Sequence, residues 1–101
     1  MNREPFKVGD FIQHFKREDK PFDFNHLYQV IGVDVLHTET GERLLVYKAL
    51  YGNCETFARP MSMAMSEVDK EKYPNYKQVY RLEKVTDEVI LGRIARLLEE
   101  S

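Results

Sequence analysis

Residues 27–51 carry the pattern that most constrains the fold. Residues 27–36 are a strand-length run of mostly apolar and β-branched side chains, and residues 43–51 repeat this character after a Thr-Gly turn. The alternation of faces continues through the first run only if one extra residue is inserted, and Gly32 lies where a bulge would supply it. The sequence therefore predicts a bent β-hairpin with residues 37–42 at its tip.

Three shorter segments with the same alternation of apolar and polar residues flank the hairpin. They are residues 11–15, 56–59 and 78–85. Charged stretches that contain proline lie between some of them and predict loops. Because bent strands are what a small closed sheet requires, the pattern predicts a mainly β domain over residues 1–85, a barrel of about five antiparallel strands.

The last segment, residues 86–101, predicts an amphipathic α-helix. Thr86 is the expected N-cap, and Asp87 and Glu88 follow in the first turn, where the helix dipole favours acidic side chains. Four apolar residues share one helical face, namely Ile90, Ile94, Leu97 and Leu98. We expect this face to pack on the barrel, and the alternative is that it forms a homodimer.

Composition and charge exclude several classes of protein. A chain of 101 residues with a formal net charge of -2 predicts one globular domain, and it argues against general nucleic-acid binding, which needs a basic face. This net charge does not exclude a local basic patch. The single cysteine, Cys54, cannot form an internal disulfide, and no apolar run reaches the about 20 residues of a membrane span. We therefore expect a cytoplasmic protein without a membrane partner.

The sequence contains no motif for a metal or a cofactor. Its three histidines lack the spacing of a zinc site, and its five glycines are isolated and form no phosphate-binding loop. Nothing around Cys54 resembles a reactive-cysteine motif. We predict neither a metal nor a cofactor.

The predicted hairpin tip combines an imidazole with a carboxylate. His37 and Glu39 share one face if strand geometry continues, so both side chains can hydrogen-bond a ligand. A structural alternative is that the tip's polar side chains bond the backbone of their own turn. A general acid–base pair at this spacing would make the protein a small hydrolase or transferase, but no nucleophile or oxyanion device accompanies it.

Aromatic residues and one arginine complete the candidate site. Tyr47 and Tyr51 lie near the end of the second hairpin strand, where rings can stack a base or cage a cation. Tyr28 and Phe57 are expected in the core, because buried aromatics contribute large apolar areas. Arg59 ends a strand and suits bidentate binding of a carboxylate or phosphate, with an internal ion pair as its alternative.

A series of short motifs follows in order along residues 8–68. They are His14-Phe15-Lys16, Leu27-Tyr28-Gln29-Val30, His37-Thr38-Glu39-Thr40, Val46-Tyr47, Leu50-Tyr51-Gly52 and Arg59-Pro60. In this order they resemble the small bacterial family called domain of unknown function 1653. The family pattern has glycine where Arg17 stands and Trp-Val where Phe57-Ala58 stands. If that tryptophan contacts a ligand in the family, Phe57 presents less area here.

The resemblance implies a compact, mostly β domain, and we expect an SH3-like barrel. It implies no activity, because the family has none assigned. Five residues match motif positions of the family, namely His37, Glu39, Tyr47, Tyr51 and Arg59. We predict that they form one pocket near the 37–42 tip, in a non-catalytic module that binds a small polar ligand, a nucleotide or a peptide.

Overall fold

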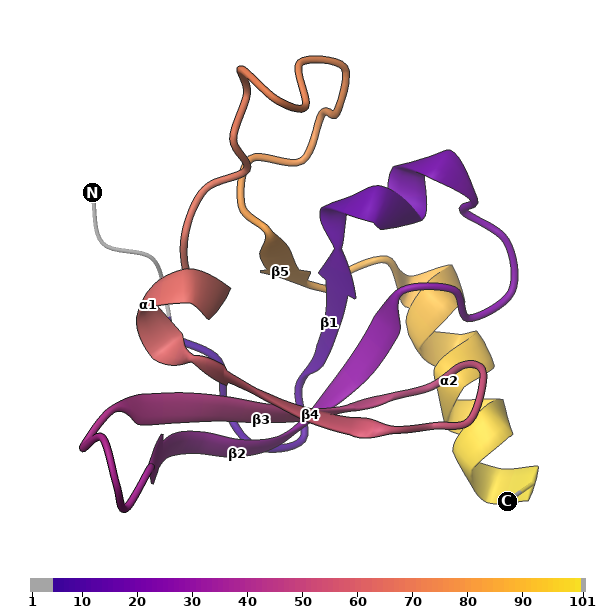
Figure 1. The fold of residues 1–101 in the computed structure, drawn as a ribbon. Coiled ribbons are helices and arrows are strands. Elements are labelled where there is room, and N and C mark those ends of the chain that lie inside the picture. Colours follow the sequence, from indigo (N-terminus) through magenta and orange to yellow (C-terminus); the bar gives the residue numbers. More distant parts are fainter. Residues whose placement is uncertain (1–4, 101) are drawn as a thin grey trace.

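A computed structural model describes residues 5–100, and Figure 1 shows its fold. Five antiparallel strands form one sheet in the order β4-β3-β2-β1-β5, and a helix ends the described chain. The mainly β class is thus confirmed. The elements are β1 (Phe11–His14), η1 (Phe15–Asp19), β2 (Leu27–Leu36), β3 (Arg43–Ala49), β4 (Thr56–Pro60), α1 (Met61–Ala64), β5 (Leu82–Lys84) and α2 (Glu88–Glu100).

The predicted bulge in β2 is confirmed at Gly32. The β2–β3 register shifts between Val30 and Gly32, and it shifts again between Gly32 and Val35. A Cβ on Gly32 would lie 2.8 Å from Cγ2 of Val35, so the backbone passes too close to its neighbour for a larger residue to fit without a shift. Bulges bend a strand and increase its twist. Figure 1 shows the result, because β1 and β5 rise from the layer that β2, β3 and β4 form.

The sheet is curled but open. β4 and β5 occupy its two edges, and the strand order of the described residues contains no pairing between them. The expected closure into an SH3-like barrel is therefore not confirmed.

The concave face of the sheet carries the main hydrophobic core. Alternation places Ile12, Val30, Leu45 and Leu82 on this face, where all four are at most 2% exposed. Met61–Ala64 forms the short helix α1, which contacts β3 and β4. The curl of the sheet brings side chains of β1 and β4 towards each other on this concave face, where they line the pocket described below.

The last strand is shorter than predicted. The strand β5 covers Leu82–Lys84, where we expected residues 78–85, and Tyr80 before it forms an isolated bridge with Glu67. The backbone N–H of Gln78 donates to Glu18, and the N–H groups of Val79 and Tyr80 donate to Glu83. Carboxylates thus satisfy the donors that a sheet ladder would otherwise use, and alternation alone does not reveal this.

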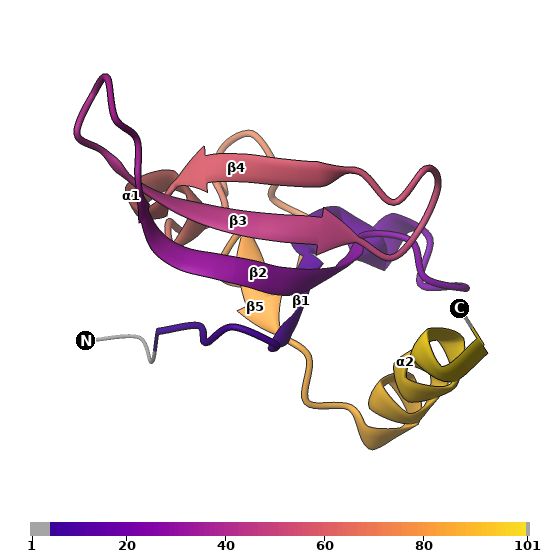
Figure 2. The same cartoon turned by 90° about the horizontal axis from the view of Figure 1, so that it is seen from below.

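Helix α2 packs on the sheet at the end opposite the 37–42 tip, as Figures 1 and 2 show. It buries Ile94 completely in a second cluster with Leu27, Leu50 and Val85. The helix thus covers part of the sheet, although Leu98 is 40% exposed. Dimerisation through this helix stays a prediction. Within residues 5–100, no helix has the length and apolar character needed to cross a membrane.

The N-cap of α2 is Asp87 and not Thr86. Its Oδ1 accepts hydrogen bonds from the N–H groups of Val89 at 2.9 Å and Ile90 at 3.3 Å. The prediction of Thr86 was wrong by one residue, because either side chain is a good cap and the sequence contains both in succession.

Asp87→Ala is expected to lower the free energy of unfolding by about 1 kcal/mol, because it removes the acceptor for two free N–H groups of the helix. Urea denaturation followed by circular dichroism measures the change. Thr86→Ala is the matched control and is expected to stay within about 0.5 kcal/mol of the parent. A larger loss in the Thr86 variant than in the Asp87 variant would contradict this assignment.

Candidate functional site

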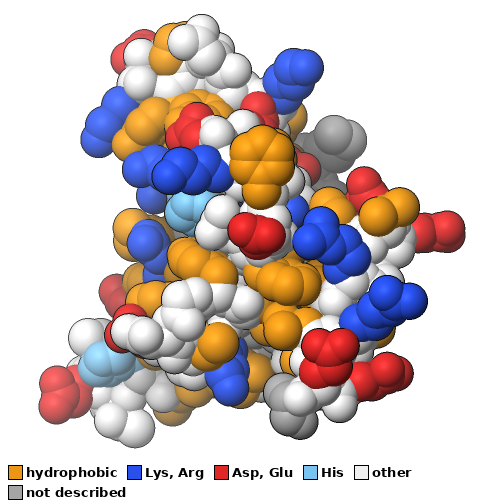
Figure 3. Space-filling view, turned by 90° about the vertical axis from the view of Figure 1, so that its right-hand side faces the viewer, with side chains coloured by type: hydrophobic (Ala, Val, Ile, Leu, Met, Phe, Trp, Pro, Cys, Tyr) orange, Lys and Arg blue, Asp and Glu red, His pale blue; other side chains and the backbone are white. Residues whose placement is uncertain are grey.

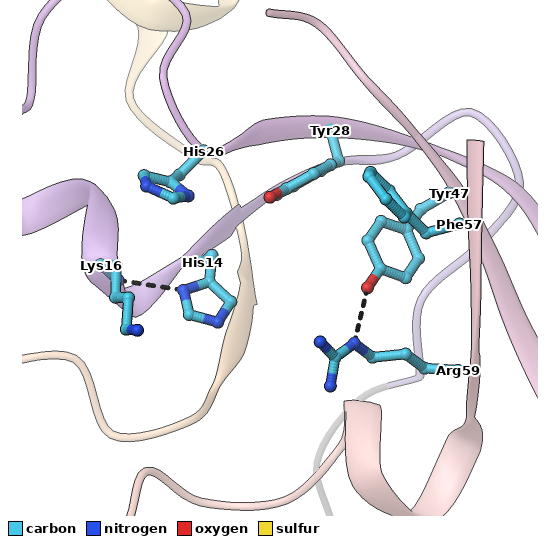
Figure 4. Close-up of a pocket in the computed structure, with 7 residues that line it drawn as sticks. All are labelled: His14, Lys16, His26, Tyr28, Tyr47, Phe57 and Arg59. Atoms are coloured by element: carbon cyan, nitrogen blue, oxygen red, sulfur yellow. Dashed lines mark hydrogen bonds between the residues drawn. The ribbon is translucent and has the colours of Figure 1, made fainter. Parts of the chain in front are cut away.

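The concave side of the sheet contains a pocket of about 240 Å³, shown in Figure 4. It has one wall from β3 and β4, a second wall from β1, η1 and the residue before β2, and a floor from β2. Its lining residues are His14, Lys16, His26, Tyr28, Tyr47, Phe57 and Arg59.

The first wall presents an aromatic ring and a guanidinium. Phe57 pairs with Tyr47 and Arg59 pairs with Leu45, so their side chains share the concave face. Nε of Arg59 donates to the hydroxyl of Tyr47 at 2.9 Å, which fixes the guanidinium at the pocket. Among the described residues, its two terminal nitrogens have no hydrogen-bond partner. This geometry leaves a fork of donors for a ligand.

Phe57 is 40% exposed, so its prediction as a core residue was wrong. It lies on β4, an edge strand of the sheet, and not in the centre of the sheet. The ring is 5.8 Å from that of Tyr47, centroid to centroid. The exposed ring of Phe57 thus adds apolar surface to this wall, next to the buried ring of Tyr47 and tilted by 39° to it.

The floor is a protonated phenol. Tyr28 is 7% exposed, and its hydroxyl lies 2.9 Å from the hydroxyl of Tyr51. Burial raises the pKa of Tyr28, and its hydrogen bond with Tyr51 raises it further. Tyr28 therefore offers a neutral hydroxyl to the pocket at physiological pH.

The second wall carries two histidines. Nδ1 of His14 accepts from the N–H of Lys16 at 3.1 Å, so the neutral ring carries its proton on Nε2. That nitrogen faces the side of the pocket where Arg59 lies (Figure 4). His26 adopts a left-handed backbone conformation with φ of 57°. Such a conformation is costly for a residue with a side chain, and strain of this kind clusters at functional sites.

A long loop fixes the position of the second wall. The carboxylate of Glu18 accepts from the N–H groups of Lys77 and Gln78, which ties η1 to the loop before β5. Phe15, buried in η1, contacts the rings of Tyr73 and Tyr76 at about 5 Å between centroids. Lys16 follows Phe15 directly, so these contacts hold its backbone at the pocket.

The pocket is electropositive. The pKa of His14 is lowered from 6.5 to about 4, mainly by burial and to a smaller extent by the charges of His26, Lys16, Arg59 and Arg81. Burial also lowers the pKa of His26. No carboxylate lines this pocket among the described residues. Unneutralised cations beside aromatic rings create a site that attracts anions.

The structure brings together only part of the predicted site. Tyr47 and Arg59 line the pocket, and Tyr51 lies behind its floor, in contact with Tyr28. Arg59 forms no ion pair with a described residue, so the alternative of an internal ion pair is not supported. His37 and Glu39 do not line this pocket.

The hairpin tip supports the structural alternative for His37. Its Nδ1 accepts from the N–H groups of Glu39 at 3.2 Å and Thr40 at 3.3 Å. The hydroxyl of Thr40 accepts from the N–H of Glu42. The Glu39 residue is exposed. The imidazole therefore stabilises its own turn.

Sequence reasoning missed His14, Lys16 and His26 as lining residues. His14 lies two residues after the fully buried Ile12, so alternation places a polar ring on the buried face at a strand end. This signal was available. Nothing in the spacing of His14 and His26 indicates that they meet, because β1–β2 pairing brings them together. Among residues 5–100, no group of three or more potential ligands could hold a metal ion.

Comparison with known protein families shows the family to which the chain belongs. The family described as "Protein of unknown function (DUF1653)" matches residues 10–84. The chain belongs to this family. The DUF1653 match covers all five strands and every residue that lines the pocket, whereas α2 lies beyond it. Comparison with curated proteins and with solved structures gives no match.

The low pKa of His14 predicts that the free energy of unfolding decreases as the pH is lowered. Between about 4 and 6.5 the unfolded chain binds more protons than the folded chain, so the stabilisation is complete above 6.5 and is lost as pH falls towards 4. His14→Asn keeps an acceptor for the N–H of Lys16 but cannot titrate. Urea denaturation across this range is expected to show a smaller loss of stability in the variant. Equal losses in both proteins would contradict the assignment.

Proposed function

We propose that this DUF1653 domain is a non-catalytic binding module whose concave pocket takes an anionic ligand with a flat ring, such as a nucleotide. The observation that carries the proposal is the guanidinium of Arg59. Its Nε donates to Tyr47, and its terminal nitrogens have no partner among residues 5–100 and share the pocket with the exposed ring of Phe57. A fixed fork of charged donors suits phosphate or carboxylate oxygens, and the ring suits a base.

The charges at the pocket favour an anion over a cation. Aromatic cages for ammonium groups depend on the negative faces of their rings. Here Lys16 and Arg59 line the same pocket, and no described carboxylate lines it to offset them. Repulsion would cancel the attraction of the rings for a cation. A cytoplasmic location, where nucleotides are present, is part of this proposal.

The hydrogen-bond donors of the pocket fit the same class of ligand. The neutral ring of His14 offers Nε2–H, and the guanidinium of Arg59 offers its free N–H groups. Tyr28 adds a neutral hydroxyl. Donors that converge on one space from two walls can orient phosphate oxygens while the base contacts Phe57.

A hydrolase or transferase that uses His37 and Glu39 receives less support. Nδ1 of His37 already accepts from the N–H groups of its own turn, and the exposed carboxylate of Glu39 has no hydrogen-bond or ion-pair partner among the described residues. The positioned acid–base pair that such chemistry needs is therefore not formed at the tip.

Arg59→Gln is expected to weaken binding of adenosine or uridine 5′-monophosphate about tenfold, because a charge-assisted hydrogen bond contributes about 1.5–3 kcal/mol. Isothermal titration calorimetry measures the affinity. Arg43→Gln is the matched control, since Arg43 lies at the start of β3 near the hairpin tip and donates only to the carbonyl of Asp34. Binding that is equally reduced in both variants, or absent in the parent, would contradict the proposal.

Phe57→Leu is expected to weaken nucleotide binding about fivefold while leaving inorganic phosphate binding unchanged, because stacking of a base on an aromatic ring contributes about 1–3 kcal/mol. Competition titrations by NMR measure both affinities. Phe22→Leu, at a phenylalanine that is 68% exposed and outside the pocket, is the control. Unchanged nucleotide affinity in the Phe57 variant would remove the ring from the site.

A further inference from the structure

The pocket continues into two neighbouring hollows. On the side of η1 it shares Lys16 and His26 with a hollow of about 320 Å³, which Lys20 also lines. On the side of α1 it shares Tyr47 and Arg59 with a narrow hollow of about 10 Å³, which Arg81 also lines. The three spaces adjoin through these shared lining residues, and together they are called the groove below.

Four cations follow this groove from one end to the other. They are Lys20, Lys16, Arg59 and Arg81. Among the described residues that line the three spaces, Asp19 contributes the one carboxylate, and it accepts a hydrogen bond from Tyr76 at 2.6 Å. The one ion pair within the described chain, between Lys84 and Asp10, lies elsewhere. The four cations thus form no ion pair with any carboxylate in the part of the chain that the structure describes.

One face of the molecule combines cationic and apolar side chains. On the face in Figure 3, lysine and arginine side chains gather around a histidine, with hydrophobic and acidic side chains next to them. Cationic and apolar groups are interleaved there, which differs from a uniformly charged surface. A polyanion that also carries flat apolar groups matches this mixture better than one that is charged alone.

We propose that the groove binds a short segment of single-stranded nucleic acid, with one base in the aromatic pocket and the flanking phosphates along the four cations. This inference rests on the proposed function, since the base occupies the same pocket. The volume of about 240 Å³ is below the roughly 300–1,000 Å³ of sites that enclose whole drug-sized ligands. A ligand that places only one ring inside and extends along the groove fits this size.

Single strands fit the groove better than a duplex or an acidic peptide. The ring of Phe57 faces a recess, and a base must leave its stack to reach it, which costs little in a single strand. An acidic peptide would satisfy the cations but would leave the ring without a partner. The net charge of -2 also argues against coating a duplex, which needs a broad basic face.

The test compares affinity for oligonucleotides of increasing length. Unlabelled uridine 5′-monophosphate and oligouridylates of two to four nucleotides are titrated into the full chain and followed by calorimetry and NMR. We expect about tenfold tighter binding of the trinucleotide than of the mononucleotide. Its affinity is expected to fall with salt at a slope of about −1.4 in log K against log salt, for two phosphates at about −0.7 each.

Variants at the ends of the groove separate the two proposals. Lys20→Gln and Arg81→Gln are each expected to weaken trinucleotide binding several-fold and to leave mononucleotide binding unchanged, because neither residue lines the central pocket. Lys48→Gln is the control, since alternation places Lys48 on the opposite face from Tyr47.

The outcomes distinguish failure of the single-strand inference from failure of the proposed function. If the mononucleotide binds and the longer oligonucleotides bind no more tightly, the single-strand inference is overturned and the proposed function stays intact. If neither ligand binds, both proposals fail. A tetraglutamate peptide that binds as tightly as the oligonucleotide would also overturn the inference, because it would show that the groove recognises negative charge and needs no base.

Discussion

The bend of β2 is the constraint on which the rest of the structure depends. In a flat sheet of this strand order, β4 and β1 would be separated by two strands at about 4.8 Å spacing, and their side chains would point in parallel. The two register shifts between Val30 and Val35 curl the sheet instead. The concave face then directs the side chains of Arg59 and His14 into one space. A pocket exists because one strand contains additional residues.

The electrostatics of the pocket follow from its position over the core. His14 continues the buried face of β1, so desolvation favours its neutral form and lowers its pKa. Arg59 lies on an edge strand, where its guanidinium stays hydrated while the hydroxyl of Tyr47 restrains it. The site therefore combines a neutral donor with charged donors and does not require a buried ion pair. Such an arrangement is suited to binding and release.

Local patterns in the sequence predicted much of the fold. Alternation identified the hairpin, the position of Gly32 predicted the bulge, and the spacing of apolar residues predicted α2. Patterns of this kind report which face of an element is buried, but they do not report how far a sheet curls. The expected barrel closure was therefore not confirmed, and the strand before α2 begins later than predicted, because carboxylates of Glu18 and Glu83 accept from the N–H groups of residues 78–80.

The site was predictable only in part for the same reason. Tyr47 and Arg59 were identified by residue type and strand position, and register brings them together. His37 was predicted as a site residue because of its polar neighbours in the sequence. In the structure, His37 accepts hydrogen bonds from the N–H groups of those same neighbours. His14 and His26 are distant from Arg59 in sequence and meet it only through the curl.

The most direct test of the account is the location of ligand-induced changes in the NMR spectrum of the whole chain. Titration with a nucleoside monophosphate is expected to shift the side-chain resonances of His14, His26 and Arg59 and the backbone amides beside them, while residues 37–42 stay unchanged. Shifts confined to residues 37–42, or no shift at any nucleotide concentration up to the millimolar range, would contradict the claim that the concave pocket binds an anionic ligand with a flat ring.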